Sequence, residues 1–138
     1  METFDRRTAL MLAAALPLWP QKSGGEQMGH PVVHFEIGCK DRAKTEQFFG
    51  DLFGWKIGGA PVIDTGSPNG IPGHIVSLGH EPHHYTMFYV EVEDVQAYLD
   101  KATALGGKMV VPPVKIPTGT FAWFSDPEGN TIGLIQRH

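Results

Sequence analysis

The stretch DVQAYLDKATALGG, residues 94–107, decides how this chain folds, because it has the pattern of a short amphipathic helix. Apolar residues recur in it at intervals of three or four, which places them on one helical face. Asp94 precedes them and can cap the free amide groups of the first turn. Gly106 and Gly107 end the pattern. The predicted apolar face comprises Val95, Tyr98, Leu99, Ala102 and Leu105.

The same pattern occurs earlier in the chain, in DRAKTEQFFGDLFG, residues 41–54. Asp41 and Asp94 are 53 residues apart (94 − 41), and Gly54 and Gly107 are also 53 apart (107 − 54). An internal duplication explains this common register more economically than two unrelated helices do. The predicted apolar face of the first helix comprises Phe48, Phe49, Leu52 and Phe53.

Strand-like stretches surround both helices in the same order. PVVHFEIG (31–38) precedes the first helix and YTMFYVEV (85–92) precedes the second, and both are rich in apolar and β-branched or aromatic residues. Three shorter strand-like stretches follow each helix. We therefore predict an α+β fold of two tandem βαβββ modules, residues 30–80 and 84–138, within a single domain, residues 30–138.

The N-terminal residues have the composition of a targeting segment. Arg6 and Arg7 precede an apolar stretch at 9–19, which is too short to span a bilayer but long enough for the core of a signal peptide. This pattern resembles a twin-arginine export signal. We expect residues 1–20 to be that signal, residues 21–29 to be a glycine-rich linker, and the protein to be exported to the periplasm. The alternative is a cytoplasmic protein whose N-terminal helix packs on the domain.

Composition excludes several kinds of partner. The chain of 138 residues has a formal net charge of −4 and no run of basic residues, whereas nucleic-acid binding needs clustered Lys and Arg. We expect no nucleic-acid partner and no stable membrane span. Cys39 is the single cysteine, so the chain cannot form an internal disulfide.

Three short motifs add to the repeat: FFGDLFGW (48–55), GGK (106–108) and DPEGN (126–130). With the duplicated βαβββ unit, they resemble the vicinal oxygen chelate superfamily, which includes glyoxalase I, extradiol dioxygenases and bleomycin-resistance proteins. The resemblance covers residues 31–136. It implies that the two modules form a curled mixed sheet around a common cleft.

Metal-dependent members of that superfamily hold one divalent ion between the first and last strands of each module. By the resemblance, His34 matches the first of these four positions, and Met87 matches its counterpart in the second module, or Phe88 if the register slips by one. Gly133 stands where the last strand usually carries Glu, and His74 is a candidate for the fourth position. Two ligands are too few for a catalytic metal. No cofactor is therefore firmly implied, and zinc, nickel, iron or manganese stays open.

Gly133 raises a further question, because a glycine inside a strand often marks the close approach of another group. We expect it to form the floor of a small-molecule pocket lined by Met87, Phe88, Phe121 and Trp123. Phe121 and Trp123 alternate on one strand face, where they either stack on a flat ligand or pack in the core.

His34 and Glu36 are the candidate catalytic pair. They lie two residues apart in a strand and therefore on the same face. If that face lines the cleft, the two side chains can act as general acid and base. The alternatives are a histidine bonded to backbone and a glutamate on the surface.

Two function classes follow. One is a glyoxalase-like or bleomycin-resistance-like protein that binds a small molecule without a full metal site. The other is a metal-dependent lyase, isomerase or dioxygenase that uses His34 and His74. Whether the two modules close within one chain or across a homodimer stays open.

The export hypothesis has a direct test. Replacing Arg6 and Arg7 by Lys should retain the protein in the cytoplasm, because twin-arginine transport depends on that residue pair. Cell fractionation and immunoblotting measure the distribution. An unchanged distribution would contradict the hypothesis.

Overall fold

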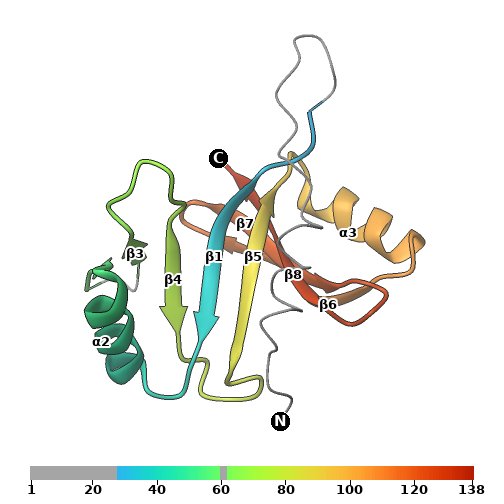
Figure 1. Ribbon diagram of the computed structural model, residues 1–138. Coiled ribbons are helices and arrows are strands. Elements are labelled where there is room, and N and C mark those ends of the chain that lie inside the picture. The colour runs from blue at the N-terminus through green and yellow to red at the C-terminus, as the bar shows by residue number, and fades with distance from the viewer. Residues whose placement is uncertain (1–27, 60–61) are drawn as a thin grey trace, which may run out of the picture.

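The computed structural model describes residues 28–59 and 62–138 (Figure 1). The predicted export signal and residues 21–27 of the predicted linker lie outside this part of the chain. Within the described ranges, none of the helices has the length and apolar character needed to cross a bilayer.

Each half of the domain contains a strand, a helix and three strands. The first half consists of β1 (Val32–Gly38), α2 (Arg42–Phe53), β2 (Lys56–Ile57), β3 (Val62–Asp64) and β4 (Gly73–Val76). The second consists of β5 (Tyr85–Glu91), α3 (Val95–Ala104), β6 (Lys108–Ile116), β7 (Gly119–Ser125) and β8 (Thr131–Arg137). The predicted duplication of a βαβββ unit is confirmed.

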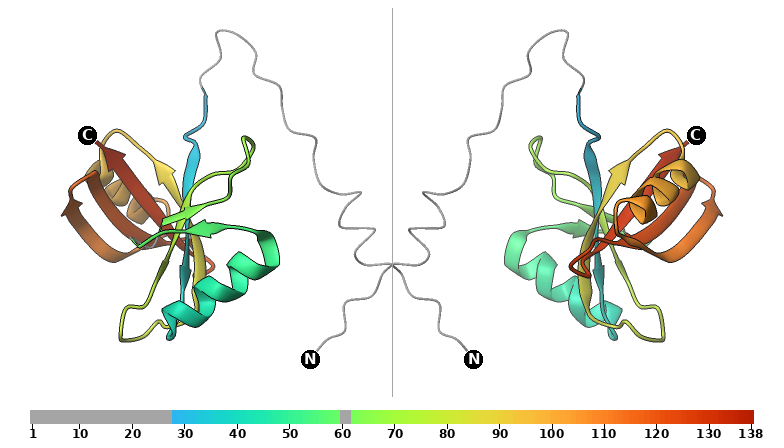
Figure 2. Two further views of the ribbon diagram at one scale, coloured as in Figure 1. Left: turned by 90° about the vertical axis from the view of Figure 1, so that its left-hand side faces the viewer. Right: turned by 90° about the vertical axis from the view of Figure 1, so that its right-hand side faces the viewer.

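The eight strands form one mixed sheet in the order β2-β3-β4-β1-β5-β8-β7-β6. Within each half, the first and last strands are parallel: β1 pairs with β4, and β5 pairs with β8. The antiparallel pair β1 and β5 joins the halves. The two halves are turned relative to each other, so the sheet is curled but not closed (Figure 2). This agrees with the predicted α+β architecture.

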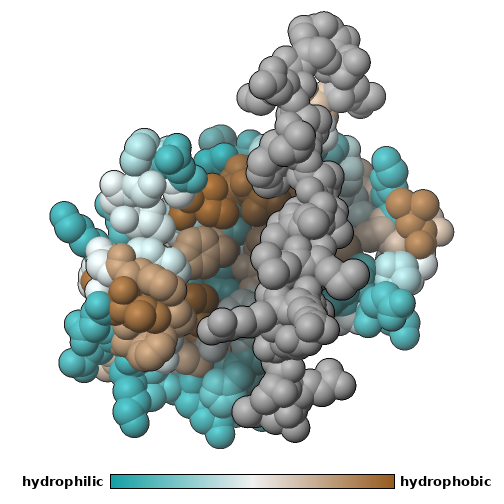
Figure 3. Space-filling model, in the orientation of Figure 1, coloured by the Kyte–Doolittle hydropathy of each residue, from teal (hydrophilic) through white to brown (hydrophobic). Residues whose placement is uncertain are grey.

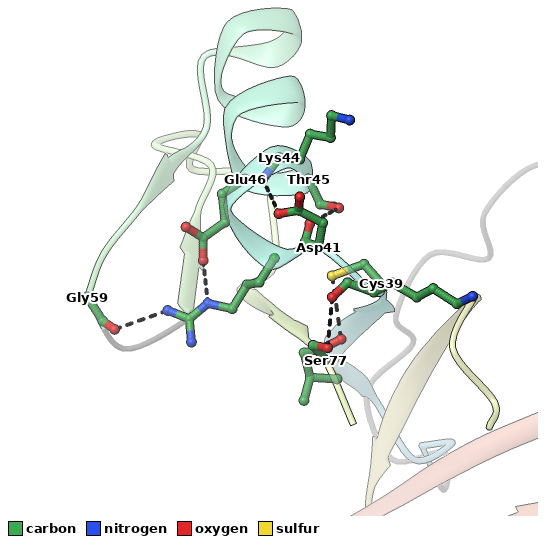
Figure 4. A network of polar contacts seen from close by, with 10 residues as sticks. Cys39, Asp41, Lys44, Thr45, Glu46, Gly59 and Ser77 are labelled. Atoms are coloured by element: carbon green, nitrogen blue, oxygen red, sulfur yellow. Dashed lines mark hydrogen bonds and ion pairs between the residues drawn. The ribbon is translucent and has the colours of Figure 1, made fainter. Parts of the chain in front are cut away.

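Both helices begin and end where the sequence pattern indicated. The carboxylate of Asp41 accepts a hydrogen bond from the amide of Lys44 at 3.0 Å (Figure 4), and Asp94 accepts one from Ala97 at 3.1 Å. Gly54 follows α2 with φ of 70°, a left-handed conformation that favours glycine. Asp41, Asp94 and Gly54 therefore act as helix boundaries, whereas α3 ends with Leu105 as its cap and Gly106, one residue before the repeated position, in the left-handed conformation.

The motif DPEGN forms the turn between β7 and β8. Oδ1 of Asp126 accepts hydrogen bonds from the amides of Glu128 and Asn130 at 2.9 and 2.8 Å. The hydrogen bonds from Asn130 hold the pKa of Asp126 below its ordinary value. The turn orders the start of β8, the strand that carries Gly133.

Two apolar clusters lie under the helices. The cluster under α3 contains Val92, Val95, Leu99, Ala122 and Leu134, and the cluster on the α2 side contains Cys39, Ile63 and Ile75. Alternate residues of β1, Phe35 and Ile37, pack against the second cluster. The helices therefore cover one face of the sheet, and the residues between these alternate positions point to the other face.

The two helices differ in how far they are buried. In α3, Val95 and Leu99 are buried as predicted, whereas Leu105 is exposed. In α2 only Phe49 of the predicted apolar face packs against the core. Phe48, Leu52 and Phe53 are exposed, and hydrophobic side chains gather over this helix (Figure 3). The edge strand β2 and its neighbour β3 have only two and three residues, so they give α2 little surface to pack against.

Candidate functional site

Two rows of residues cross the sheet on the face opposite the helices. Residues directly opposite each other on paired strands project to the same face, so the register decides which side chains meet. One row is His34, Tyr89, Gly133 and Trp123, on β1, β5, β8 and β7. The next row is His74, Glu36 and Met87, on β4, β1 and β5.

Glu36 is the centre of the site. It is only 3% exposed, and its carboxylate accepts hydrogen bonds from Nε2 of His74 at 2.7 Å, from the hydroxyl of Tyr89 at 2.7 Å and from the hydroxyl of Tyr85. The indole of Trp123 in turn donates to the Tyr89 hydroxyl at 2.9 Å. Groups from β4 and β5 thus converge on one side chain of β1, and Trp123 of β7 bonds to one of them.

These contacts determine which groups carry charge. Burial by itself raises the pKa of Glu36, but the hydrogen bonds from His74, Tyr85 and Tyr89 outweigh it and hold that pKa below its ordinary value. Burial, together with the bond to Glu36 and its negative charge, raises the pKa of both tyrosines. At neutral pH the carboxylate is therefore ionised and both phenols are protonated.

The two histidines extend this network toward the cleft. Nε2 of His34 lies 2.5 Å from Nδ1 of His74, so Glu36, His74 and His34 form a continuous hydrogen-bonded chain. Burial lowers the pKa of His34 to about 4, and His74 lowers it further when that ring is protonated, an effect that the negative charge of Glu36 only partly offsets. His34 is therefore neutral at physiological pH.

Two glycines make room for the tyrosine rings. A Cβ atom at Gly133 would overlap the ring of Tyr89, and a Cβ at Gly38 would overlap the ring of Tyr85. The close approach indicated by Gly133 is thus the approach of Tyr89. This corrects the expectation that Gly133 forms the floor of the pocket, because the ring of Tyr89 covers it.

A pocket of about 440 Å³ opens beside this network. His34, Glu36, His74 and Tyr89 supply polar groups, and most of the other lining side chains are apolar. The apolar and aromatic lining residues are Val33, Pro72, Val76, Leu78, Ile116, Phe121, Trp123 and Ile135, and Thr118 and Arg137 complete the lining.

Some of the candidate residues from the sequence line the pocket, and others are buried beside it or point away from it. His34, Glu36, His74, Phe121 and Trp123 line the pocket together. Met87 is buried against Tyr89 and Trp123 and does not line it, and Gly133 lies beneath the Tyr89 ring.

Phe88 was a candidate only if the register slipped by one residue. It is 40% exposed and paired with Phe35, whose side chain packs on the α2 side of the sheet. Because side chains alternate along a strand, Phe88 points away from the pocket. The candidacy of Phe88 is therefore corrected.

Sequence reasoning missed Tyr85 and Tyr89, which bond to Glu36. A signal was present, since Tyr89 lies 53 residues after Glu36 (89 − 36) and so occupies the equivalent position in the second module. What the sequence could not reveal is that the hydroxyl crosses to β1.

The sheet register also tests the correspondence between the modules. Glu36 pairs with His74 across β1 and β4, and Tyr89 pairs with Gly133 across β5 and β8. Because Glu36 and Tyr89 are equivalent by the repeat, Gly133 is the counterpart of His74. The first module has an imidazole at this position, and the second module has no side chain there.

The donor geometry does not fit a metal ion. Two nitrogens bound to one tetrahedral zinc, each at about 2.0–2.1 Å, stand about 3.3 Å apart, whereas the facing nitrogens of His34 and His74 are 2.5 Å apart. Glu36 bonds to Nε2 of His74, whereas His34 bonds to Nδ1 on the other side of that ring. The side chains of His34, His74 and Glu36 therefore do not converge on one point. Across the described residues, no three His, Cys, Asp or Glu side chains form a group suited to a metal.

Comparison with known proteins assigns most of the chain to one family model. The model described as Glyoxalase/Bleomycin resistance protein/Dioxygenase superfamily matches residues 32–134. A glyoxylase-like domain-containing protein of Didymella fabae is 28% identical over 120 residues, which cover 77% of this chain and 93% of that protein. CFP32 of Mycobacterium bovis, provisionally described as a glyoxylase, is 30% identical over 73% of this chain, which matches only 43% of its length.

Solved structures share the fold at low sequence identity. Methylmalonyl-CoA epimerase from Mycobacterium tuberculosis superposes with a TM-score of 0.58 at 11% identity, covering 78% of this chain and 87% of that one. A superfamily member from Vibrio splendidus gives 0.51 at 16% identity, covering 80% of this chain and all of that one. At these identities the likeness concerns the fold alone.

The packing of Tyr89 on Gly133 predicts a stability effect. Gly133→Ala should lower the free energy of unfolding by about 1–3 kcal/mol, because the added methyl group overlaps the ring. In a Tyr89→Leu background the same change should cost less, which a double-mutant cycle in urea measures. Gly59→Ala is the matched control, since no atom of the described residues outside its chain neighbours lies within 4 Å of its Cβ position. Equal costs in both backgrounds would contradict this packing.

The lowered pKa of His34 predicts a pH effect on stability. The unfolded chain binds a proton at His34 more readily than the folded chain, so stability should fall as pH drops from about 6.5 to about 4. Glu36, whose pKa is also lowered, adds to this loss at the acidic end. Thermal melting at several pH values should show a shallower decline for His34→Gln than for wild type. The exposed control His84→Gln should keep the wild-type decline, and identical profiles for all three proteins would disprove the assignment.

Proposed function

This chain belongs to the Glyoxalase/Bleomycin resistance protein/Dioxygenase superfamily, and from that premise we propose that its pocket binds a small, flat and mostly apolar molecule without a metal ion. The observation that carries the proposal is the pocket itself, which places one polar cluster at the side of an otherwise apolar cavity. A few convergent polar groups in an apolar cavity are typical of small-molecule sites.

The size and lining of the pocket limit its ligand. A volume of about 440 Å³ suits a molecule of one or two rings. Phe121 and Trp123 offer aromatic surfaces, which favours a flat ligand. The exposed Arg137 is paired with Glu91, so the pocket offers no unpaired cation for an anionic group. The ligand is therefore mostly uncharged when it enters.

The polar cluster orients the ligand. His34 and His74 are both in the pocket lining, and His34 is neutral at physiological pH. Nε2 of His34 faces Nδ1 of His74, so the other nitrogen of this neutral ring is left to bond with the ligand. We expect the polar group of the ligand to lie against His34, with its apolar body toward Ile135 and Phe121.

A metal-dependent lyase, isomerase or dioxygenase is the alternative reading of the same family. It would need at least three converging ligands. His34 and His74 are turned toward each other rather than toward a shared point, and their counterparts in the second module are Met87 and Gly133. The donor geometry therefore favours the metal-free proposal.

Two matched probes test the proposal, 4-nitroanisole and 4-nitrophenol. Both are flat and fit the pocket, and for molecules of this size we expect Kd of about 0.1–1 mM. In a ¹H–¹⁵N NMR titration, the indole signal of Trp123 should shift with saturation. The indole signal of Trp55, which packs with Phe35 and Phe49 on the helix side, should not.

A pair of variants locates the binding. Ile135→Trp fills the pocket and should abolish the titration, whereas Ile71→Trp places the same side chain outside it and should leave both Kd values unchanged. Thermal melting confirms that both variants fold. Absence of saturable binding of either probe to the wild type would overturn the proposal, and so would unchanged binding to a folded Ile135→Trp.

A further inference from the structure

We infer that Glu36, His74 and His34 form a proton relay that accepts the proton of a weakly acidic hydroxyl on the ligand, so that the ligand is held as its anion. This inference rests on the proposed function and adds the chemical class of the ligand. That class comprises small phenols and enols, in which the negative charge of the anion spreads over a flat conjugated system.

The hydrogen bonds determine where the protons lie. Ionised Glu36 can only accept, so the nitrogen of His74 that faces it, Nε2, carries a proton. In neutral His74 the other nitrogen, Nδ1, is then an acceptor, and it must receive the proton on Nε2 of His34. Nδ1 of neutral His34 therefore has a free lone pair.

That lone pair is not buried, and it belongs to a side chain that lines the pocket. His34 lines the cavity, and within residues 28–59 and 62–138 its Nδ1 has no hydrogen-bond partner in the protein. It is also not enclosed, because Nδ1 of His83 is the single buried side-chain polar atom without a partner in those ranges. A ligand hydroxyl is the natural partner, since it donates a hydrogen bond to an acceptor.

The transfer proceeds in two coupled moves. The O–H bond of the ligand breaks, its electron pair stays on the oxygen, and the proton bonds to Nδ1 of His34. The proton on Nε2 of His34 then crosses the 2.5 Å separation to Nδ1 of His74. His74 becomes an imidazolium that keeps its hydrogen bond to the Glu36 carboxylate. No oxidant, reductant or co-reactant is needed.

The surroundings favour the final state, in which His74 holds the proton and the ligand is an anion. The pKa of His34 is lowered to about 4, so a proton does not remain there, and His74 offers a position beside a negative charge. An anion in the pocket is attracted to the imidazolium more strongly than in water, because the cavity is largely apolar.

Other ionisable groups near the relay do not compete for the proton. The pKa of Tyr85 and of Tyr89 is raised, so both stay protonated and continue to donate to Glu36. Arg137 lies in the pocket lining but is paired with Glu91. Within the described residues, the ionisable groups around the three relay members are Cys39, Tyr85, Tyr89, Glu91 and Arg137.

The two nitro probes test the relay by their absorption. The 4-nitrophenolate anion absorbs in the visible range, whereas the neutral phenol does not. In complex with the wild-type protein at mildly acidic pH, the ratio of phenolate to phenol should be at least about tenfold higher than for the free probe, a shift of about one pKa unit. The probe 4-nitroanisole has no acidic proton and reports binding alone.

Three variants remove successive members of the relay. His34→Gln, His74→Gln and Glu36→Gln should each return the bound phenolate ratio to within about threefold of the free value, because each breaks the path or removes its charge. Each ratio is taken at saturating 4-nitrophenol, and the Kd of each variant for 4-nitroanisole is measured in parallel, so that weaker binding is not counted as a change in ionisation. His84→Gln, an exposed histidine outside the pocket, should keep the wild-type ratio. If Glu36→Gln does not fold, His74→Gln removes the same hydrogen bond between His74 and Glu36 by changing the less buried of the two side chains.

The outcomes separate the two proposals. If neither probe binds, the proposed function fails. If both bind and bound 4-nitrophenol has the ionisation ratio of the free probe, binding stands and the relay is overturned. A raised ratio that persists in folded His34→Gln and His74→Gln also overturns it, because the anion would then be stabilised by other groups.

Discussion

The site depends on the burial of one carboxylate. An ionised side chain removed from water is strongly destabilising unless hydrogen bonds replace its hydration. Glu36 meets this requirement with three donors, His74 from β4 and Tyr85 and Tyr89 from β5. These donors reach it only in the observed register, because a slip of one residue would turn a strand's side chains to the opposite face. The carboxylate therefore couples the alignment of three strands to the chemistry of the cleft.

The donors in turn need space that only glycine leaves. Tyr85 lies over Gly38 and Tyr89 lies over Gly133, on strands that flank β5 on either side. The same rings form an apolar surface with Met87 and Trp123, so they support the cleft as well as the carboxylate. Glycine at these two positions is a packing requirement of the sheet, not an open part of the pocket.

The duplicated modules make unequal contributions to the cleft. The first supplies the carboxylate and both imidazoles, whereas the equivalent positions of the second hold Tyr89, Met87 and Gly133. A symmetric arrangement would direct ligands from both modules to one point, as a metal requires. Here the polar groups bond to one another along a line, and most of the other side chains that line the cavity are apolar. This asymmetry is what favours an organic ligand and a proton-accepting chain.

The fold was predictable from the sequence because its signals are local. Asp41, Asp94, Gly54 and Gly107 repeat at 53 residues, and caps, periodicity and turns depend on neighbours within a few positions. The same reasoning placed His34 and Glu36 on one strand face and named His74, Phe121 and Trp123 as candidates. It could not find the hydrogen bonds of Tyr85 and Tyr89 to Glu36, nor the contact between His34 and His74, which join residues 40 to 53 positions apart. Which side chains meet across strands is set by sheet register and by the glycines that admit a ring, and only the tertiary structure decides these.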